Sequence, residues 1–177
     1  DENIYIGDSV EIANILKSGE WIGDYGIGLH GFINKLLIGI IYIFTGPSVF
    51  IATLSNILFA IFSGILFFKV LNIHFKFSKI FSFLGVTMLF SSYQFLMYTP
   101  TFYRDIMAVF FSLLVLNSIL SKKSRWLTGV FLLFLLDSKE HVFYTMSIGL
   151  VLWIGIESII NSKNKILNAI KYFILNC

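Results

Sequence analysis

Acidic side chains are concentrated at the beginning of the chain, in residues 1–31. This segment holds six of the ten acidic residues in the sequence, namely Asp1, Glu2, Asp8, Glu11, Glu20 and Asp24. A carboxylate can act as a general base and take the proton from an acceptor hydroxyl as that hydroxyl attacks another molecule. The adjacent pair Asp1-Glu2 is the first candidate for this chemistry, and we expect residues 1–31 to form a wet, reactive surface.

Two more polar clusters follow much later in the sequence. The first is Tyr103-Arg104-Asp105, and the second is Asp137-Ser138-Lys139-Glu140-His141. Their carboxylates can position a hydroxyl, and their cations can receive a phosphate group as it leaves. Ionisable residues beside apolar runs usually line a cavity or a path, so we expect both clusters to converge with residues 1–31 in one site.

The composition indicates the environment in which such a site would lie. The chain has 177 residues, of which 57% are hydrophobic, 18% aromatic and only 13% charged, and its mean hydropathy is +0.85. Soluble domains have about 45–50% apolar and about 25% charged residues. We therefore predict an integral membrane protein of the all-α class, a polytopic bundle of transmembrane helices with an amphipathic loop lying on its outer face.

Other classes of function fit poorly. Lysine and arginine occur in short runs at the ends of apolar segments, which is unlike a nucleic-acid-binding surface. The three histidines are scattered and the one cysteine, Cys177, is terminal, so no metal-ligand spacing is present. We expect no cofactor, and the sequence leaves a divalent cation open.

The segments before residue 48 are expected to lie outside the hydrocarbon core. Asp8-Ser9-Val10-Glu11 has the form of a capping box and predicts the start of a short amphipathic helix that Gly19 ends. Residues 1–31 then form an external loop that is rich in glycine towards its end. Residues 32–46 are apolar but too short to span comfortably, and Gly46-Pro47 closes them, which predicts a surface or re-entrant helix.

The rest of the chain is expected to cross the membrane repeatedly. A span needs about 20 apolar residues, and the apolar runs predict membrane helices over residues 48–68, 80–98, 105–120, 127–138 and 141–160, with the start of a further span at 166–177. The chain begins at Asp1 without a methionine and stops within an apolar run. We expect one membrane domain that is a piece of a larger protein.

The charges predict the orientation. Nine of the thirteen lysines and arginines fall in alternate loops, at positions 69, 76, 79, 122, 123, 125, 163, 165 and 171. Such an excess marks the cytoplasmic side. Nine of the ten acidic residues, all except Glu157, then face the opposite side. This assignment requires that residues 32–46 do not cross.

The order of these motifs resembles a family. Asp1-Glu2 with Tyr5, then Ser18-Gly19-Glu20-Trp21 and a glycine-rich loop, is similar to the first external loop of the GT-C membrane glycosyltransferases. The types most similar are the protein O-mannosyltransferases and the aminoarabinose transferases of lipid A. Tyr103-Arg104-Asp105 and the run from Ser124-Arg125-Trp126 to Ser138-Lys139-Glu140 also match in order and spacing. The chain departs from the family near His30, where the family's prolines are absent, and it lacks the span that should precede Asp1.

The resemblance implies roles for individual residues. Asp1 would be the general base, with Glu2 beside it. Asp105 would position the acceptor or the sugar. Arg104, Lys139 and His30 would hold the polyprenyl phosphate as it leaves, with Glu140 nearby in the substrate-binding group.

The resemblance also implies the reaction and its location. The enzyme would move a sugar from a polyprenyl-phosphate donor, with inversion, to a lipid, glycan or protein acceptor. It would lie in a bacterial plasma membrane with its active site facing outside. The sequence identifies neither the sugar nor the acceptor.

Other interpretations stay open. The pair Asp1-Glu2 can be the solvated start of a loop, Asp8 and Glu11 can be helix caps, and Arg104-Asp105 can be a local ion pair. The cluster at 137–141 can be ordinary loop polarity. A transporter or flippase of lipid-linked sugars is an alternative function, although it would need charged or helix-breaking residues within spans. A non-catalytic membrane subunit is another, and it would have scattered acidic residues.

Overall fold

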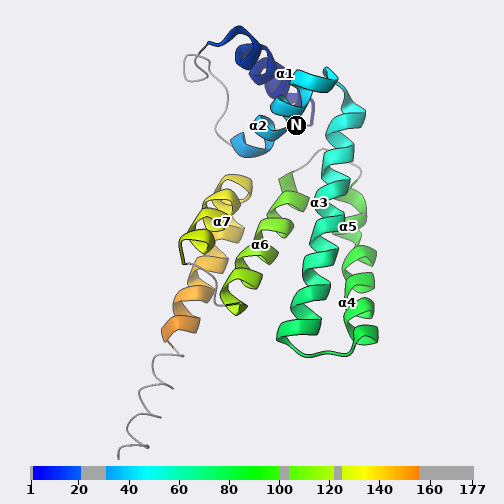
Figure 1. The fold of residues 1–177 in the computed structure, drawn as a ribbon, viewed down its shortest axis with the longest axis vertical. Helices are drawn as coiled ribbons and strands as arrows, with labels where there is room; N and C mark the ends of the chain where they lie inside the picture. The colour runs from blue at the N-terminus through cyan, green and yellow to red at the C-terminus, as the bar shows by residue number, and fades with distance from the viewer. Residues whose placement is uncertain (1, 21–30, 100–103, 122–124, 156–177) are drawn as a thin grey trace, which may run out of the picture. The chain divides into compact units, whose positions relative to one another are not determined.

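The structure, a computed structural model, describes residues 2–20, 31–99, 104–121 and 125–155. It divides into two compact units, Asp1–Val142 and Phe143–Cys177, which are described separately. The described residues form helices joined by turns, with no strand among them (Figure 1). The all-α class is therefore confirmed, whereas the membrane placement stays a prediction.

The first two helices, α1 (Glu2–Ser18) and α2 (Phe32–Thr45), pack against each other. The predicted capping box is wrong, because α1 begins at Glu2 and residues 8–11 lie inside the helix. Gly19 ends α1 as predicted, with a φ of 77° that favours glycine. The two helices approach closely at Gly39, where an added Cβ would lie 2.8 Å from Ile12 Cγ2.

The core of this pair includes Ala13, Ile38 and Tyr42, together with Ala52 from the following helix. The Tyr42 hydroxyl donates a hydrogen bond to the Ser48 carbonyl oxygen at 2.9 Å. Burial raises the pKa of Tyr42 above its ordinary value of 10.0. The hydrogen bond ties the body of α2 to the residue that precedes the next helix.

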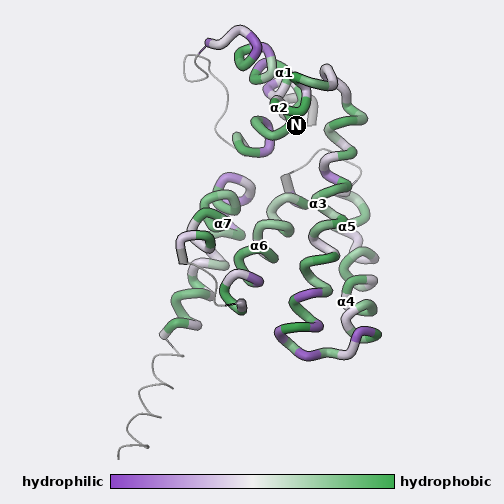
Figure 2. Tube along the Cα trace, viewed as in Figure 1, coloured by the Kyte–Doolittle hydropathy of each residue, from purple (hydrophilic) through white to green (hydrophobic). Residues whose placement is uncertain are grey.

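The longest helical segment is α3 (Val49–Lys69), which continues into one π-helical turn, η2 (Val70–His74). Val49–His74 has 26 residues and is the one helix in the described ranges that is long and apolar enough to cross a membrane. By colour, Figure 2 shows a hydrophobic α3 that ends in hydrophilic residues at the turn to α4. The predicted span over residues 48–68 therefore coincides with a helix.

Residues 80–98 were expected to form one continuous helix, and the structure divides them in two. The first part is α4 (Lys79–Ser91) and the second is α5 (Tyr93–Tyr98). Between them Ser92 is extended, with φ −64° and ψ 137°. Its hydroxyl accepts a hydrogen bond from Phe95 N at 3.4 Å, so it caps α5 and stabilises the break.

The last helices of the first unit are α6 (Arg104–Leu120) and α7 (Arg125–Ser138), which pack against each other, while α6 also packs against α3. Ser118 and Thr128 share a hydrogen bond at 2.8 Å between α6 and α7. The bounds of α6 and α7 agree with the helices expected over residues 105–120 and 127–138. In the second unit, residues 143–155 are helical.

Candidate functional site

The carboxylate in the first turn of α6 forms an ion pair with the cation that follows α7. Asp105 lies where the partial positive charge of a helix N-terminus stabilises an anion. Lys139 comes directly after Ser138, the last residue of α7. The Lys139 and Asp105 side chains are 24% and 28% exposed. Since water reaches both groups, the pair holds them in place but contributes only about 0–1 kcal/mol to stability.

A cavity of about 540 Å3 lies beside this ion pair. Asp105, Lys139 and His141 line it with a carboxylate, an ammonium group and an imidazole. These three residues lie where α6 begins and just after α7 ends. Most of the remaining wall is apolar and comes from α4, α5, α6 and Val142: Leu89, Phe95, Ile106, Ala108, Val109 and Leu113. The volume falls within the range of about 300–1,000 Å3 that is usual for small-molecule sites.

The serine hydroxyls in the cavity wall are already engaged with the backbone. Ser112 Oγ donates to the Ala108 carbonyl oxygen at 2.8 Å, and Ser92 Oγ donates to the Leu89 carbonyl oxygen at 2.8 Å. These bonds within a helix or turn leave the ion pair as the principal charged feature of the wall. The cavity is therefore mainly apolar, with one cation and one carboxylate fixed at its edge.

Asp137 holds the end of α7 against the beginning of α2. Its carboxylate accepts hydrogen bonds from Phe32 N at 3.1 Å and from Ile33 N at 2.9 Å. Gly31 N donates to the Asp137 backbone oxygen at 3.2 Å. The first amides of a helix have no partner within the helix, so Asp137 caps α2 from a distant part of the chain. Lys139 lies two residues further on.

A second ion pair lies between α1 and α2. Lys35 Nζ is 2.7 Å from Asp8 Oδ2, and the two side chains are 4% and 22% exposed. The Asp8 carboxylate stabilises this buried cation, because breaking a buried ion pair is strongly destabilising. Asp8 therefore stabilises the helix pair, a role that neither of the interpretations made from the sequence had assigned to it.

The structure brings together two of the predicted site residues and leaves others outside its description. Asp105 and Lys139 meet at the cavity, and Glu140 next to Lys139 is exposed. Glu2 begins α1 and Arg104 begins α6, but their side chains lie outside the described part of the chain. Asp1 and His30 lie outside the described residues altogether.

His141 belongs to a polar cluster that was expected to join the site, but no role was predicted for it, and it lines the cavity. The signal was present, because His141 belongs to the same polar cluster as Lys139 and follows it by two positions. Tyr98 also lines the cavity. Nothing in its sequence context distinguishes it from the other aromatic residues of an apolar segment.

Within the described ranges, no group of three or more His, Cys, Asp or Glu side chains is arranged to hold a metal ion. What the ion pair and cavity can do is bind a ligand that is largely apolar and carries one anionic group. Lys139 would attract the anion, and Asp105 would hold Lys139 in place and accept hydrogen bonds from hydroxyls.

Comparisons of the chain with models of protein families, with curated proteins and with solved structures find no match. Any function of the chain therefore has to be inferred from its own residues.

Proposed function

We propose that this chain is part of a GT-C-type membrane glycosyltransferase. It moves a sugar from a polyprenyl-phosphate donor to an acceptor hydroxyl on the extracytoplasmic side of a bacterial plasma membrane, with inversion at the anomeric carbon. The acceptor is a lipid, a glycan or a protein. The observation that carries the proposal is the Asp105–Lys139 ion pair at the edge of a mostly apolar cavity.

The chemistry of the donor suits that arrangement. A polyprenyl-phosphate sugar combines a long hydrocarbon chain, an anionic phosphate and a ring of hydroxyls. The apolar wall is compatible with the hydrocarbon, the Lys139 ammonium with the phosphate, and the Asp105 carboxylate with sugar or acceptor hydroxyls. Arg104 and His30 would add cations at the phosphate, and Glu140 would add a carboxylate beside Lys139.

The reaction needs a base that removes the proton of the acceptor hydroxyl. In this proposal Asp1 takes that proton, with Glu2 beside it, while the phosphate leaves towards Lys139. The bond between the anomeric carbon and the phosphate oxygen breaks as the new glycosidic bond forms. Stabilising the charge that develops on the leaving phosphate is the main contribution expected of the cations.

The test is transfer of radiolabelled sugar from a panel of polyprenyl-phosphate sugars to membrane acceptors by the full-length protein. The Asp1→Asn variant should lose about 10² to 10⁴ in rate, the usual contribution of a general base. The control is Glu11→Gln, which removes an exposed carboxylate of α1 and should leave the rate unchanged. If Asp1→Asn transfers as fast as the wild type, Asp1 is not the base.

The ion pair needs a test that separates positioning from stability. Exchanging the two residues, with Asp105→Lys and Lys139→Asp together, keeps an ion pair of similar length between α6 and the end of α7. The exchanged protein should unfold only slightly more easily than the wild type, because a cation in the first turn of α6 is less favourable than a carboxylate by about 0.3–1 kcal/mol. It should lose donor binding, seen as a higher KM for the polyprenyl-phosphate sugar. Unchanged KM in the exchanged protein would mean that the pair only fastens the helices. Absence of transfer from every donor would favour a transporter or a non-catalytic subunit.

A further inference from the structure

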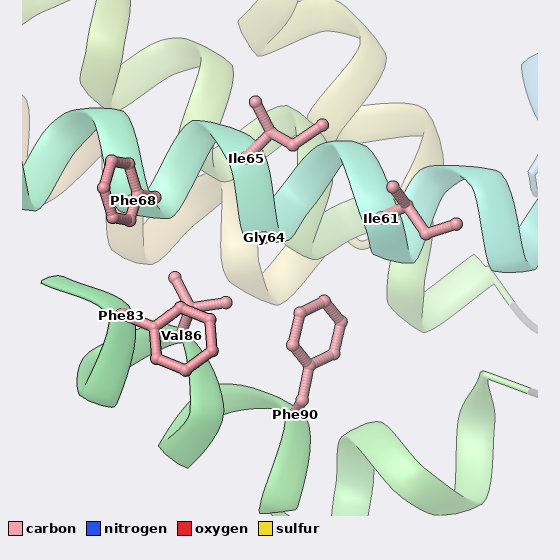
Figure 3. A pocket seen from close by; sticks show the side chains of 7 residues that line it. All are labelled: Ile61, Gly64, Ile65, Phe68, Phe83, Val86 and Phe90. Carbon is pink, nitrogen blue, oxygen red and sulfur yellow. The ribbon is translucent and has the colours of Figure 1, made fainter. Parts of the chain in front are cut away.

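An apolar groove runs between α3 and α4, away from the cavity described above. Its volume is about 370 Å3, and its wall is almost entirely hydrocarbon. Figure 3 shows Ile61 and Phe90 towards one end of the groove and Phe68 and Phe83 towards the other. Gly64 lies between them on α3, where an added Cβ would lie 2.6 Å from Phe90 Cζ. The groove is open along its side and lined by hydrocarbon, which suits a hydrocarbon chain.

Three exposed lysines lie where this groove ends, at the turn between α3 and α4. Lys69 directly follows Phe68, and Lys79 precedes Phe83 by one helical turn, on the same face of α4. Lys76 lies in the turn itself. None of the three has an ion-pair partner among the described residues. The sequence has no acidic residue from position 25 to position 104, so this end of the groove is uniformly cationic.

The turn that carries these lysines is fixed rather than loose. Asn72 Nδ2 donates to the Phe77 carbonyl oxygen at 2.9 Å, and Phe77 N donates to the Leu71 carbonyl oxygen at 3.1 Å. Lys76 has a φ of 56°, the only positive φ of a non-glycine residue in the described chain. That conformation is strained for an L-residue. A glycine would avoid this strain, so the lysine at this position points to a use for its charge.

Exposed aromatic residues flank the lysines. Phe75 and Phe77 are 52% and 51% exposed, and their ring centroids are 6.4 Å apart. Aromatic residues mixed with lysines are typical of the boundary between hydrocarbon and water. The turn therefore resembles a segment at a membrane interface. The hydrocarbon-lined groove lies on one side of it, and the turn itself carries the lysines.

We propose that the α3–α4 hairpin binds a phospholipid with an anionic headgroup. One acyl chain lies in the groove between Ile61 and Phe83, and the headgroup phosphate lies at Lys69, Lys76 and Lys79. The proposal rests on the membrane placement assumed in the proposed function, but not on glycosyl transfer. This lipid is a permanent neighbour of the hairpin and differs from the polyprenyl-phosphate donor assigned to the cavity beside Asp105.

The test measures lipid binding to the purified full-length protein by native mass spectrometry. Phosphatidylglycerol and phosphatidylcholine of equal chain length are compared, and the wild type should retain the anionic lipid more strongly. Replacing Lys69, Lys76 and Lys79 together by glutamine should reduce that preference about fivefold for each lysine removed, equivalent to ~1 kcal/mol per cation near the surface. The control is Lys17→Gln, an exposed lysine of α1, which should change nothing.

Two more variants keep the test decisive if the triple variant fails to fold. Lys76→Gly removes a cation and relieves the positive φ, so it should stabilise the protein and still weaken the preference for phosphatidylglycerol about fivefold. Ile65→Trp fills the groove and should reduce binding of both lipids. Soluble glycerol phosphate should not compete, because it has no acyl chain.

Equal retention of the two lipids by the wild type would overturn the proposal, as would an undiminished preference in Lys76→Gly. Competition by glycerol phosphate would show a simple phosphate site instead of a lipid site. Stronger retention of polyprenyl phosphate than of phosphatidylglycerol would assign the groove to the donor only if Ile65→Trp abolished it, because Ile65 lines the groove and not the cavity beside Asp105. None of these measurements needs sugar transfer. The lipid-binding proposal can therefore fail while the proposed enzyme activity holds, and the enzyme activity can fail while lipid binding holds.

Discussion

Asp137 is expected to stabilise α2 although it lies more than a hundred residues away in the sequence. Its two carboxylate oxygens accept the amide protons of Phe32 and Ile33, which no residue of the helix itself can accept. The first perturbation is Asp137→Ala, which removes both acceptors. The expected loss in the free energy of unfolding is about 2 kcal/mol, the upper end of the range for a lost helix cap.

The second perturbation, Asp137→Asn, removes the charge and one acceptor but keeps one amide oxygen. It should cost about 1 kcal/mol, the net value of one hydrogen bond. When SDS is added to the protein in detergent micelles, Asp137→Ala should therefore unfold at the lowest SDS concentration, Asp137→Asn at a higher one and the wild type at the highest. Glu11→Gln, the change of an exposed carboxylate on α1, is the control and should unfold with the wild type.

Hydrogen exchange then tests the location of the effect. In Asp137→Ala, the amides of Phe32 and Ile33 should exchange faster, while those in the middle of α3 should keep their wild-type protection. A wild-type unfolding midpoint for Asp137→Ala would refute the cap. Unchanged protection of Phe32 and Ile33 alongside a lowered midpoint would mean that Asp137 acts somewhere else.

Three more predictions concern the pairing of α1 with α2, and each is measured by unfolding in micelles. Asp8→Asn should cost roughly 3 kcal/mol, because it removes the carboxylate that lies 2.7 Å from the buried Lys35 ammonium. Lys35→Met should cost less, since Asp8 is partly exposed. Equal losses would contradict this. Gly39→Ala should lower the free energy of unfolding by about 1–3 kcal/mol, because the added methyl group overpacks against α1. The control is Gly129→Ala, which has open space around it and should be neutral or slightly stabilising. Destabilisation by both substitutions would mean that the effect comes from the helix backbone instead. Tyr42→Phe should cost about 1 kcal/mol through the lost hydrogen bond. Because the pKa of Tyr42 is raised above 10.0, the unfolded chain loses that proton first; stability should then fall as the pH rises above 10, and Tyr42→Phe should show a smaller fall.

The positions of the helices were predictable from the sequence because apolar runs and helix-ending residues act locally. Gly19 and Gly46 each adopt a positive φ where a helix has ended, as their types and contexts indicate. The start of α1 was not predictable in this way. The sequence at residues 8–11 fits a capping box, but the helix begins six residues earlier, and Asp8 pairs with Lys35 instead.

The side-chain contacts that join distant helices were harder to predict. Asp137 was recognised as part of a polar cluster, but its partners are backbone amides of α2, and no sequence pattern links a carboxylate to amides so far away. The meeting of Asp105 with Lys139 was expected only in general terms, as a convergence of polar clusters. Contacts of this kind depend on how helices pack, which a hydropathy pattern does not specify.

The break at Ser92 is the other feature that the apolar pattern concealed. Two adjacent serines are a weak signal within a run that is otherwise hydrophobic. The helix ends there because Ser92 caps α5 with its own hydroxyl. The sequence therefore predicted that residues 80–98 are helical, but not that they form two helices.

The break at Ser92 affects how the length of a helix is used to judge whether it can cross a lipid bilayer. At about 1.5 Å per residue, the 13 residues of α4 reach only about two thirds of the ~30 Å hydrocarbon thickness. Backbone groups at the bend are nevertheless hydrogen-bonded: Ser92 N donates to the Leu89 carbonyl oxygen at 3.2 Å, and Leu96 N donates to the Ser92 carbonyl oxygen at 3.0 Å. A bend with most of its backbone groups paired is tolerated within the hydrocarbon layer when neighbouring groups satisfy the rest. Counting only unbroken helices therefore undercounts the crossings open to this chain, because α4 and α5 together can make one.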